Sequence, residues 1–504
     1  MTTLALFPLL ASATVWVNPS LAPQGANSTP SNLTQVETSQ LSLNSFLRTV
    51  DANFPKMVSV RLESNLANSK AQEKRGAFDP VFSFNSDFIR YNPSSAPGKA
   101  YETQMSEGTI EVLDRSGAKL AVGARLNNGR VKSPGNSTGD WGEYFVSAKI
   151  PLIRDCLTNA KTVAEKQALL GVPLADQFIR QTRFDVLQKA GDVYWDWVGA
   201  GEKLRINQAL YDLAVDRAKF IKLRVEAGAN PAIDNAEANA EVFRRKGSLE
   251  KAERDLQKSE LKLQFFLWNQ QTIAEPKPLQ RTRLPLLASQ FELPTQNAIE
   301  AGKNTALMER PELLGIQLSR DLFSLDLALA ENERKPALDF TLGPGTDLGG
   351  GGIGLTYKTG LFYSIPLRQN TADGRIIQVQ VKLQKLDLEE KQTRQGILIE
   401  VSDAVSSLKQ TLERVKATEL EVTAARELER GEKIRFDNGS STLFLINQRE
   451  RGRAEAEIRY ADVRVEMEQA NLNYLITTTQ IMKSMEPATT KLLTPVKPEG
   501  APRG

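Results

Sequence analysis

Four short segments of the chain alternate between apolar and polar side chains. Runs at 81–91, 144–150 and 355–365 place aromatic and aliphatic residues on one face and mostly polar residues on the other. A weaker run begins at 337 and passes into a glycine-rich stretch. Such alternation predicts β-strands with one apolar face. Strands of this kind form either a transmembrane barrel, with the apolar face toward lipid, or half of a soluble β-sandwich.

A fifth alternating run, at 118–126, lies between the first two of these segments. The interval from Pro80 to Pro151 is more than twice as long as the corresponding interval from Pro336 to Pro366. We therefore expect four principal strands, with an additional hairpin in the first external loop.

Two much longer segments, 174–227 and 374–438, contain no proline, and their apolar residues are spaced alternately three and four apart. This spacing predicts helices that pack along a coiled-coil-like seam. At 1.5 Å per residue these helices would be about 80 to 95 Å long. Charged residues crowd the opposite faces, which predicts solvated surfaces. Pro173 is expected to start or kink the first helix.

Two short motifs occur twice in the chain. Ile-Pro-Leu closes a strand run at 150–152 and again at 365–367, and Arg-x-x-x-Gly ends a long helical pattern at 224–228 and again at 435–439. Landmarks recur at an offset of 256 residues before the strand regions and of 211 to 215 residues after them, which predicts two internal structural repeats. Each glycine suits the left-handed position that ends a helix, after which a second long helix returns.

These patterns divide the chain into two repeats and their flanking segments. The predicted order is an export signal at 1–22, a disordered segment at 23–40, a first repeat at 41–270, a proline-rich linker at 271–297, a second repeat at 298–485 and a disordered tail at 486–504. Each repeat opens with a helix. Strands then occupy about 80–152 and about 337–367, followed by long helix pairs at 158–268 and 374–485.

The N-terminal segment resembles an export signal of atypical form. Residues 4–17 are mostly apolar, and Ala-Ser-Ala at 11–13 and Ser-Leu-Ala at 20–22 resemble cleavage sites, but no positive charge precedes the apolar run. The alternative is a disordered apolar tail. No cysteine follows either cleavage site, so no N-terminal lipid anchor is expected. No later segment is long and apolar enough to predict a transmembrane helix.

The composition excludes several kinds of catalytic site. The chain contains no histidine, so histidine general bases, Ser-His-Asp triads and histidine-ligated metals are ruled out. Its one cysteine, Cys156, cannot form an internal disulfide. The formal net charge of +3 is small for 504 residues and does not favour nucleic acid as a partner. We expect no enzyme activity, no cofactor and no metal.

Two other features have both a structural and a functional interpretation. The glycine run at 343–354 lacks the lysine of a phosphate-binding loop and is interpreted as a flexible loop between strands. Asp234 and Glu237 follow the first Arg-x-x-x-Gly turn. They either support the start of the returning helix or place carboxylates near a pore mouth, where acidic rings select cations.

Taken together, these motifs resemble those of the TolC-like outer membrane factors. The resemblance rests on the two repeats, the two Ile-Pro-Leu strand ends, the two Arg-x-x-x-Gly turns, Arg-Pro-Glu-Leu at 310–313 and the segment Ser-Ser-Thr-Leu-Phe-Leu-Ile-Asn-Gln-Arg at 440–449. It extends from about residue 41 to residue 485. The order and spacing of the motifs carry the resemblance more than any single motif does.

The resemblance implies a mixed, mainly helical fold. Three protomers would share one 12-stranded β-barrel, with four strands from each, and would form a long α-helical barrel across the periplasm. Independently of the resemblance, four strands are too few to close a barrel with a lumen, so oligomerisation is expected.

The resemblance also implies a location and partners. The trimer would lie in the outer membrane of a Gram-negative bacterium, in contact with its lipid, and would reach into the periplasm. An adaptor protein would dock at the helix tips and link them to an inner-membrane pump. The positions that match the family's tip turns are Arg224, Gly228, Arg435, Gly439 and Ser440.

At the entrance, the sequence departs from the pattern of some family members. Those proteins close the channel with an aspartate ring and an arginine latch from the second tip. Here that stretch offers Ser441, Leu445 and Gln448 instead. The expected constriction therefore consists of Asp234, Glu237, Leu445 and Gln448, and closure would use apolar contacts or Asp234.

The predicted function is a passive outer-membrane exit duct of a tripartite efflux or type I secretion system. The alternative is a soluble or periplasmic coiled-coil scaffold, or an adaptor protein, without a pore. The two differ in whether the apolar strand faces meet lipid.

Overall fold

In a computed structural model, the chain is described over residues 41–481 except for 93, 95–96, 132–135, 269–283, 286, 288–289 and 350. The predicted export signal, the segment at 23–40, most of the linker and the C-terminal tail lie outside the described residues. The described residues belong to one compact unit. The boundaries of the two repeats at 41–270 and 298–485 stay a prediction.

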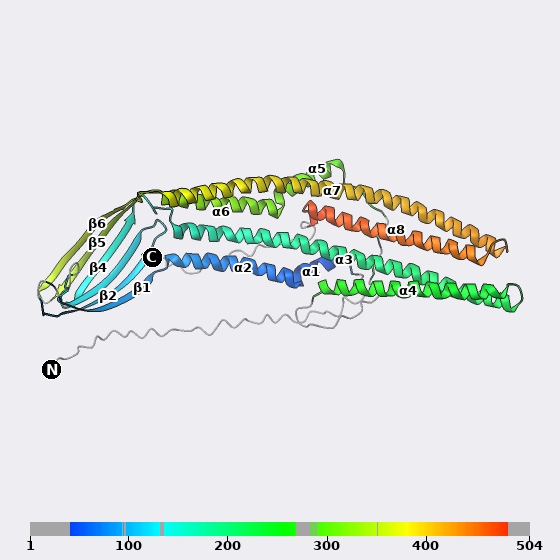
Figure 1. Cartoon of the computed structure of the whole chain (residues 1–504), viewed down its shortest axis with the longest axis horizontal. Coiled ribbons are helices and arrows are strands. Elements are labelled where there is room, and N and C mark those ends of the chain that lie inside the picture. The colour runs from blue at the N-terminus through cyan, green and yellow to red at the C-terminus, as the bar shows by residue number, and fades with distance from the viewer. Residues whose placement is uncertain are drawn as a thin grey trace, which may run out of the picture. The chain divides into compact units, whose positions relative to one another are not determined.

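Six antiparallel strands form one sheet in the order β1-β2-β3-β4-β5-β6 (Figure 1). Their bounds are β1 Val81–Tyr91, β2 Tyr101–Leu113, β3 Lys119–Gly129, β4 Gly142–Pro151, β5 Ala337–Gly349 and β6 Gly352–Ser364. Strands of 10 to 13 residues have the length needed to cross a bilayer when tilted. The sheet is open, because β1 and β6 each pair on one side only.

The expectation of four strands per protomer is wrong, because the sheet of one protomer contains six. The additional hairpin predicted from the run at 118–126 is present, but its strands β2 and β3 continue the sheet between β1 and β4 instead of lying in an external loop. The alternation of apolar and polar residues is weak in β2. On the face that is apolar elsewhere, only Ile110 and Val112 near its end are apolar.

The glycine run at 343–354 is strand for most of its length, so its interpretation as a flexible loop is wrong. Gly343 pairs with Lys358 of β6, and Gly345 pairs with Thr356. A Cβ atom at Gly345 would lie 2.6 Å from the Thr356 hydroxyl oxygen and 3.2 Å from Cβ of Phe145. Glycine is therefore required there by close packing of neighbouring strands.

The helices include two of exceptional length. Their bounds are α1 Leu43–Asn53, α2 Pro55–Arg75, α3 Ala160–Glu226, α4 Ala232–Phe266, α5 Gln296–Glu309, α6 Pro311–Glu333, α7 Asn370–Asp437 and α8 Leu443–Thr477. With 67 and 68 residues, α3 and α7 are each about 100 Å long. Across the described part of the chain, no helix combines the length and apolar character of a membrane span.

Helix α3 begins earlier than the position of Pro173 suggested. Asn159 caps the helix, since its side-chain oxygen accepts hydrogen bonds from the backbone N–H groups of Lys161 (3.1 Å) and Thr162 (2.9 Å). Pro173 lies inside the helix and does not start it. The long uninterrupted hydrogen-bond ladder on both sides tolerates the one donor that proline lacks.

The order helix, strands, long helix, turn, long helix occurs twice. Pro55 and Pro311 each occupy the first turn of a helix that leads into the sheet. Helices α4 and α8 have 35 residues each. The predicted pair of structural repeats is therefore present, and the hairpin β2–β3 is the main departure from it.

The helices pack through a buried core centred on α3. Tyr194 and Trp197 of α3 are 1% exposed and pack with Phe46 of α1. Two glycines let α8 approach α3 closely. A Cβ atom at Gly191 would lie 2.0 Å from Leu472, and one at Gly199 would lie 2.7 Å from Val465.

Candidate functional site

The turn between α3 and α4 is a complete Schellman motif. The Gly228 N–H donates to the carbonyl of Val225 (3.0 Å), and the Ala229 N–H donates to the carbonyl of Arg224 (2.8 Å). Gly228 has a φ of +72°, and no atom lies within 4 Å of where its Cβ would be. Glycine is therefore needed for its backbone conformation and not for space. The Arg224 guanidinium lies over the Phe220 ring, 5.7 Å from its centroid.

The turn between α7 and α8 repeats this geometry. The Gly439 N–H donates to the carbonyl of Phe436 (3.0 Å), the Ser440 N–H donates to that of Arg435 (2.8 Å), and Gly439 again has a φ of +72°. The Ser440 hydroxyl adds a second hydrogen bond to the Arg435 carbonyl (3.0 Å). The predicted left-handed glycines are confirmed at both tips.

The two turns lie together at the end of the helices that is remote from the sheet (Figure 1). A small apolar cluster joins them. Ile221 of α3 and Ile446 of α8 are fully buried and pack with Ala238 of α4, Leu443 of α8 and partly buried Phe436 of α7. Both ends of the duplicated helix pairs therefore form one surface, which we call the tip.

Asp234 and Glu237 lie on α4 directly after the first turn. The Asp234 carboxylate accepts a hydrogen bond from the Asn230 side-chain amide (2.7 Å) and lies in the first turn of the helix. The carboxylate therefore supports the start of the helix, as the structural interpretation of Asp234 predicts. Partial burial, with the neighbouring carboxylates of Asp234 and Glu241, raises the pKa of Glu237.

The equivalent positions of the second pair carry no charge. Leu445 is half-buried and Gln448 is exposed. Thr442 caps α8 by accepting from the Leu445 N–H (3.4 Å). Among the described residues, no hydrogen bond or ion pair joins Asp234 or Glu237 to Leu445 or Gln448. The grouping of the four expected entrance residues at one constriction stays a prediction.

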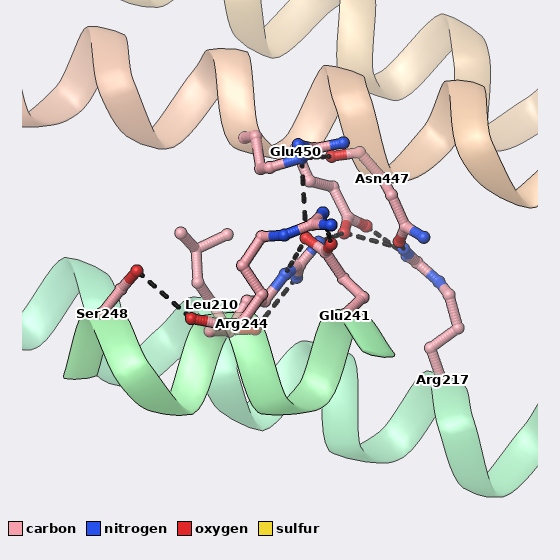
Figure 2. A network of polar contacts seen from close by, with 9 residues as sticks. Leu210, Arg217, Glu241, Arg244, Ser248, Asn447 and Glu450 are labelled. Carbon is pink, nitrogen blue, oxygen red and sulfur yellow. Dashed lines mark hydrogen bonds and ion pairs between the residues drawn. The ribbon is translucent and has the colours of Figure 1, made fainter. Parts of the chain in front are cut away.

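Above the tip, the structure contains a buried polar layer that was not predicted from the sequence (Figure 2). The Glu450 side chain of α8 is 2% exposed. It accepts hydrogen bonds from Arg217 of α3 (2.7 Å to Oε2) and from Arg245 of α4 (2.8 Å). Arg217 also donates to the Asn447 amide oxygen (3.1 Å). One carboxylate therefore ties three helices together.

A second buried carboxylate completes the layer. Glu241 of α4 accepts from Arg245 (2.9 Å) and from Arg244 (2.6 Å). Arg245 also donates to the backbone carbonyl of Leu210 on α3 (3.0 Å). Arg451 of α8 lies 3.6 Å from the Glu241 carboxylate. Both carboxylates are thus neutralised by arginines, as burial of charge requires.

Helical spacing could have located this layer. On α4, Glu241 and Arg245 continue the three-and-four spacing of the buried residues Ala238 and Leu249. On α3, Arg217 likewise lies between buried Ala214 and Ile221. The general interpretation of charged residues as solvated faces does not hold at these seam positions. A charge at a seam position costs stability but specifies which helices pair, and in which register.

The sheet has one continuous apolar face. Directly paired residues of neighbouring strands share a face, so Ile110, Val122 and Val146 lie side by side across β2, β3 and β4. Their side chains are 48%, 51% and 54% exposed. At the edges, Phe84 of β1 and Leu355 of β6 are 67% and 87% exposed. This protomer leaves the whole face without cover, which in a water-soluble protein would be unusual.

The other face is largely polar. A row of directly paired residues crosses five strands at Asn85, Glu107, Arg125, Glu143 and Asp347. Arg125 donates to Glu143 (2.5 Å), and the Thr356 hydroxyl donates to the same carboxylate (2.7 Å). Apolar-out and polar-in alternation is the arrangement of a barrel wall between lipid and water.

No family model and no curated protein sequence matches the chain. Solved structures do match. The Campylobacter jejuni CmeC outer membrane channel has a TM-score of 0.64 at 12% identity, covering 88% of this chain and 89% of that chain. The open state of the Neisseria gonorrhoeae MtrE outer membrane channel has a TM-score of 0.62 at 13% identity, covering 86% and 88%. The chain has the fold of an outer-membrane channel.

A membrane protein from Pseudomonas aeruginosa also has this fold, with a TM-score of 0.64 at 14% identity, covering 88% of this chain and 95% of that chain. Each of these three matches covers at least 86% of the chain. The expected resemblance to TolC-like outer membrane factors is confirmed at the level of fold, as is the mixed, mainly helical class.

Proposed function

We propose that the protein is a passive outer-membrane exit duct of a tripartite efflux or type I secretion system. One observation carries the proposal: a sheet with an exposed apolar face continues into helices of about 100 Å. The sheet suits a bilayer, and the helices suit the width of a periplasm. The duct lies in the outer membrane of a Gram-negative bacterium and extends into the periplasm.

The working unit is a homotrimer. Six strands with two open edges do not enclose a lumen wide enough for transport, so each protomer needs copies of itself to complete a wall. The matched fold belongs to outer-membrane channels, which supports channel function over catalysis. The energy for transport comes from an inner-membrane pump, and no cofactor takes part.

The tip is the docking surface for a periplasmic adaptor protein. Arg224 and the exposed residues Gly228, Arg435, Gly439 and Ser440 present two equivalent turns at the tip surface. Asp234, Glu237, Leu445 and Gln448 line the entrance once three tips assemble around an axis. Since the acidic pair occurs only on the first helix pair, the two pairs contribute differently to closure.

The decisive test is single-channel conductance of the purified trimer in planar bilayers. Discrete conductance steps are expected. A trimer that gives no pores in any lipid or at any pH would refute the proposal. Extraction provides a second test, because a coiled-coil scaffold or adaptor without a pore would leave the membrane with salt and without detergent. In a scaffold outside the membrane, the apolar face of the sheet would also be exposed to water.

A further inference from the structure

The hairpin β2–β3 is part of the wall of the sheet and not a surface extension. All of β1 is paired with β2, from Val81 opposite Glu111 to Tyr91 opposite Tyr101. On the other side of the hairpin, β3 pairs with β4, from Lys119 opposite Lys149 to Arg125 opposite Glu143. The hairpin is therefore hydrogen-bonded on one side to β1, which follows α2, and on the other side to β4, which precedes α3.

The turn of this hairpin is anchored beside the start of α3. Arg115 in the turn forms two hydrogen bonds with the Glu165 carboxylate of α3 (2.8 and 2.9 Å). The Thr162 hydroxyl donates to the Arg115 carbonyl (3.1 Å), and the Leu157 N–H donates to the Ser116 carbonyl (3.0 Å). The hairpin therefore reaches the level at which the sheet joins the helices.

Gly117 shows how closely the turn fits. Its φ is +90°, and a Cβ atom there would lie 2.2 Å from the Asp155 carbonyl oxygen. The Arg115 guanidinium also lies over the Phe78 ring, 4.7 Å from its centroid. The turn therefore contacts Phe78, which precedes β1, and Asp155, which follows β4. These contacts hold it beside both segments that join the sheet to helices in the first repeat.

The free edges of the sheet complement each other. Successive strands are antiparallel and their number is even, so β6 of one copy lies antiparallel to β1 of the next when copies are arranged in a ring. The apolar face continues to both edges, with Phe84 and Phe88 on β1 and Leu355 and Tyr357 on β6. Long exposed edges of this kind require a partner.

We propose that three copies, each contributing six strands, form one closed 18-stranded barrel in which the hairpin β2–β3 is part of the wall. The proposal rests on the trimeric duct proposed above. With strands about 4.8 Å apart and tilted by about 40°, the backbone diameter is about 36 Å, against about 24 Å for 12 strands. Barrels of 16 to 18 strands leave an open aqueous channel, so the outer-membrane section accepts wider cargo than 12 strands allow.

Distances between spin labels test the number of strands. The label is placed at Val146→Cys, on the apolar face of β4, in a Cys156→Ser background, and distances within the trimer are measured by pulsed dipolar spectroscopy. An 18-stranded trimer places the three Cα atoms about 31 Å apart, and a 12-stranded one about 21 Å apart, before the equal reach of the label is added.

The matched control is a chain without β2 and β3, in which a short turn joins β1 to β4 as an antiparallel pair. Its label separation is expected to be about 10 Å shorter than that of the full chain. If this variant does not fold, the distance in the full chain alone decides between the two barrels. Conducting trimers with a separation near 21 Å would overturn the proposal and leave the duct intact. Absence of trimers would overturn both.

Discussion

At the residue scale, Gly228 and Gly439 have the same φ of +72° and the same open surroundings. Only the backbone conformation requires glycine there, because a left-handed conformation is costly for residues with a Cβ atom. Both sites were predicted from the sequence, since an arginine four residues before a glycine recurs at the end of each long helix.

We expect Gly228→Ala and Gly439→Ala each to destabilise the tip by about 1 kcal/mol. Adaptor binding, measured by crosslinking in intact membranes, should weaken while the trimers persist. Gly431→Ala is the control, because Gly431 is an exposed helical residue with an ordinary φ. Alanine there should stabilise α7 by about 0.5–1 kcal/mol. Unchanged crosslinking in both tip variants would argue against docking at the turns.

Glu450→Ala should be among the most damaging single substitutions in the helical region. It leaves the buried Arg245 and the partly buried Arg217 without their shared carboxylate, which costs about 3–5 kcal/mol. Thermal unfolding followed by circular dichroism measures the loss. Glu421→Ala is the matched control, because Glu421 pairs with Arg459 at the surface and contributes about 1 kcal/mol or less. Equal effects of the two substitutions would contradict a buried polar layer.

At the element scale, the strands and helices differ in how clearly the sequence marks them. The run at 81–91 coincides with β1, because its phenylalanines alternate with polar residues over the whole strand. β2 lacks that contrast, since Gln104, Ser106 and Gly108 occupy the face that is apolar in other strands. Its place in the sheet comes from pairing with β1 and β3, which local alternation does not encode.

We expect Val122→Lys to impair insertion of the sheet far more than Ala121→Lys. Val122 lies on the apolar face, where lysine costs about 2–4 kcal/mol at the middle of a bilayer and less toward its edges. Ala121 lies on the polar face, between Glu111 and Ser147, where lysine finds water and a carboxylate. The urea midpoint for folding into lipid vesicles measures the difference. Similar midpoints for both variants would contradict the assignment of faces.

Acidification should release the hairpin turn from α3. The hydrogen bonds from Arg115 lower the pKa of Glu165 below its ordinary value of 4.5, although burial opposes this shift. A depressed carboxyl pKa contributes stability above the ordinary value, and this stability is lost as the pH falls through the depressed one. Protection of the turn amides against hydrogen exchange, corrected for intrinsic rates, should therefore fall below about pH 4.5. Glu165→Gln should remove the part of this pH dependence that comes from Glu165, while Asp114 in the turn, whose pKa is lowered by hydrogen bonds from Ser116, keeps its own part.

At the scale of the whole molecule, the sequence predicted the repeated order of elements and the tip turns. It did not predict how many strands each protomer adds to the sheet. It also failed to place Glu241, Arg245 and Glu450 inside, because residue type alone assigns charges to the surface. Their burial follows from the position of each residue along a seam, and that position is decided by which helices pack together.

The protomer by itself leaves two sheet edges and an apolar face uncovered, so its stability should depend on assembly. For a trimer that unfolds to monomers, tenfold dilution in detergent should lower the apparent free energy of unfolding by about 2.7 kcal/mol per trimer. Unfolding midpoints at two protein concentrations measure this change. A midpoint independent of concentration would indicate a self-sufficient monomer.

The anchored hairpin also bears on how such a chain can vary. Adding one strand to the sheet would reverse the direction of every strand after it, and β4 would then end on the wrong side of the membrane for α3. Adding two strands preserves the parity of the sheet, so both long helices keep their starting points. The calibre of the membrane section can therefore change in steps of one hairpin per protomer without redesign of the helical conduit.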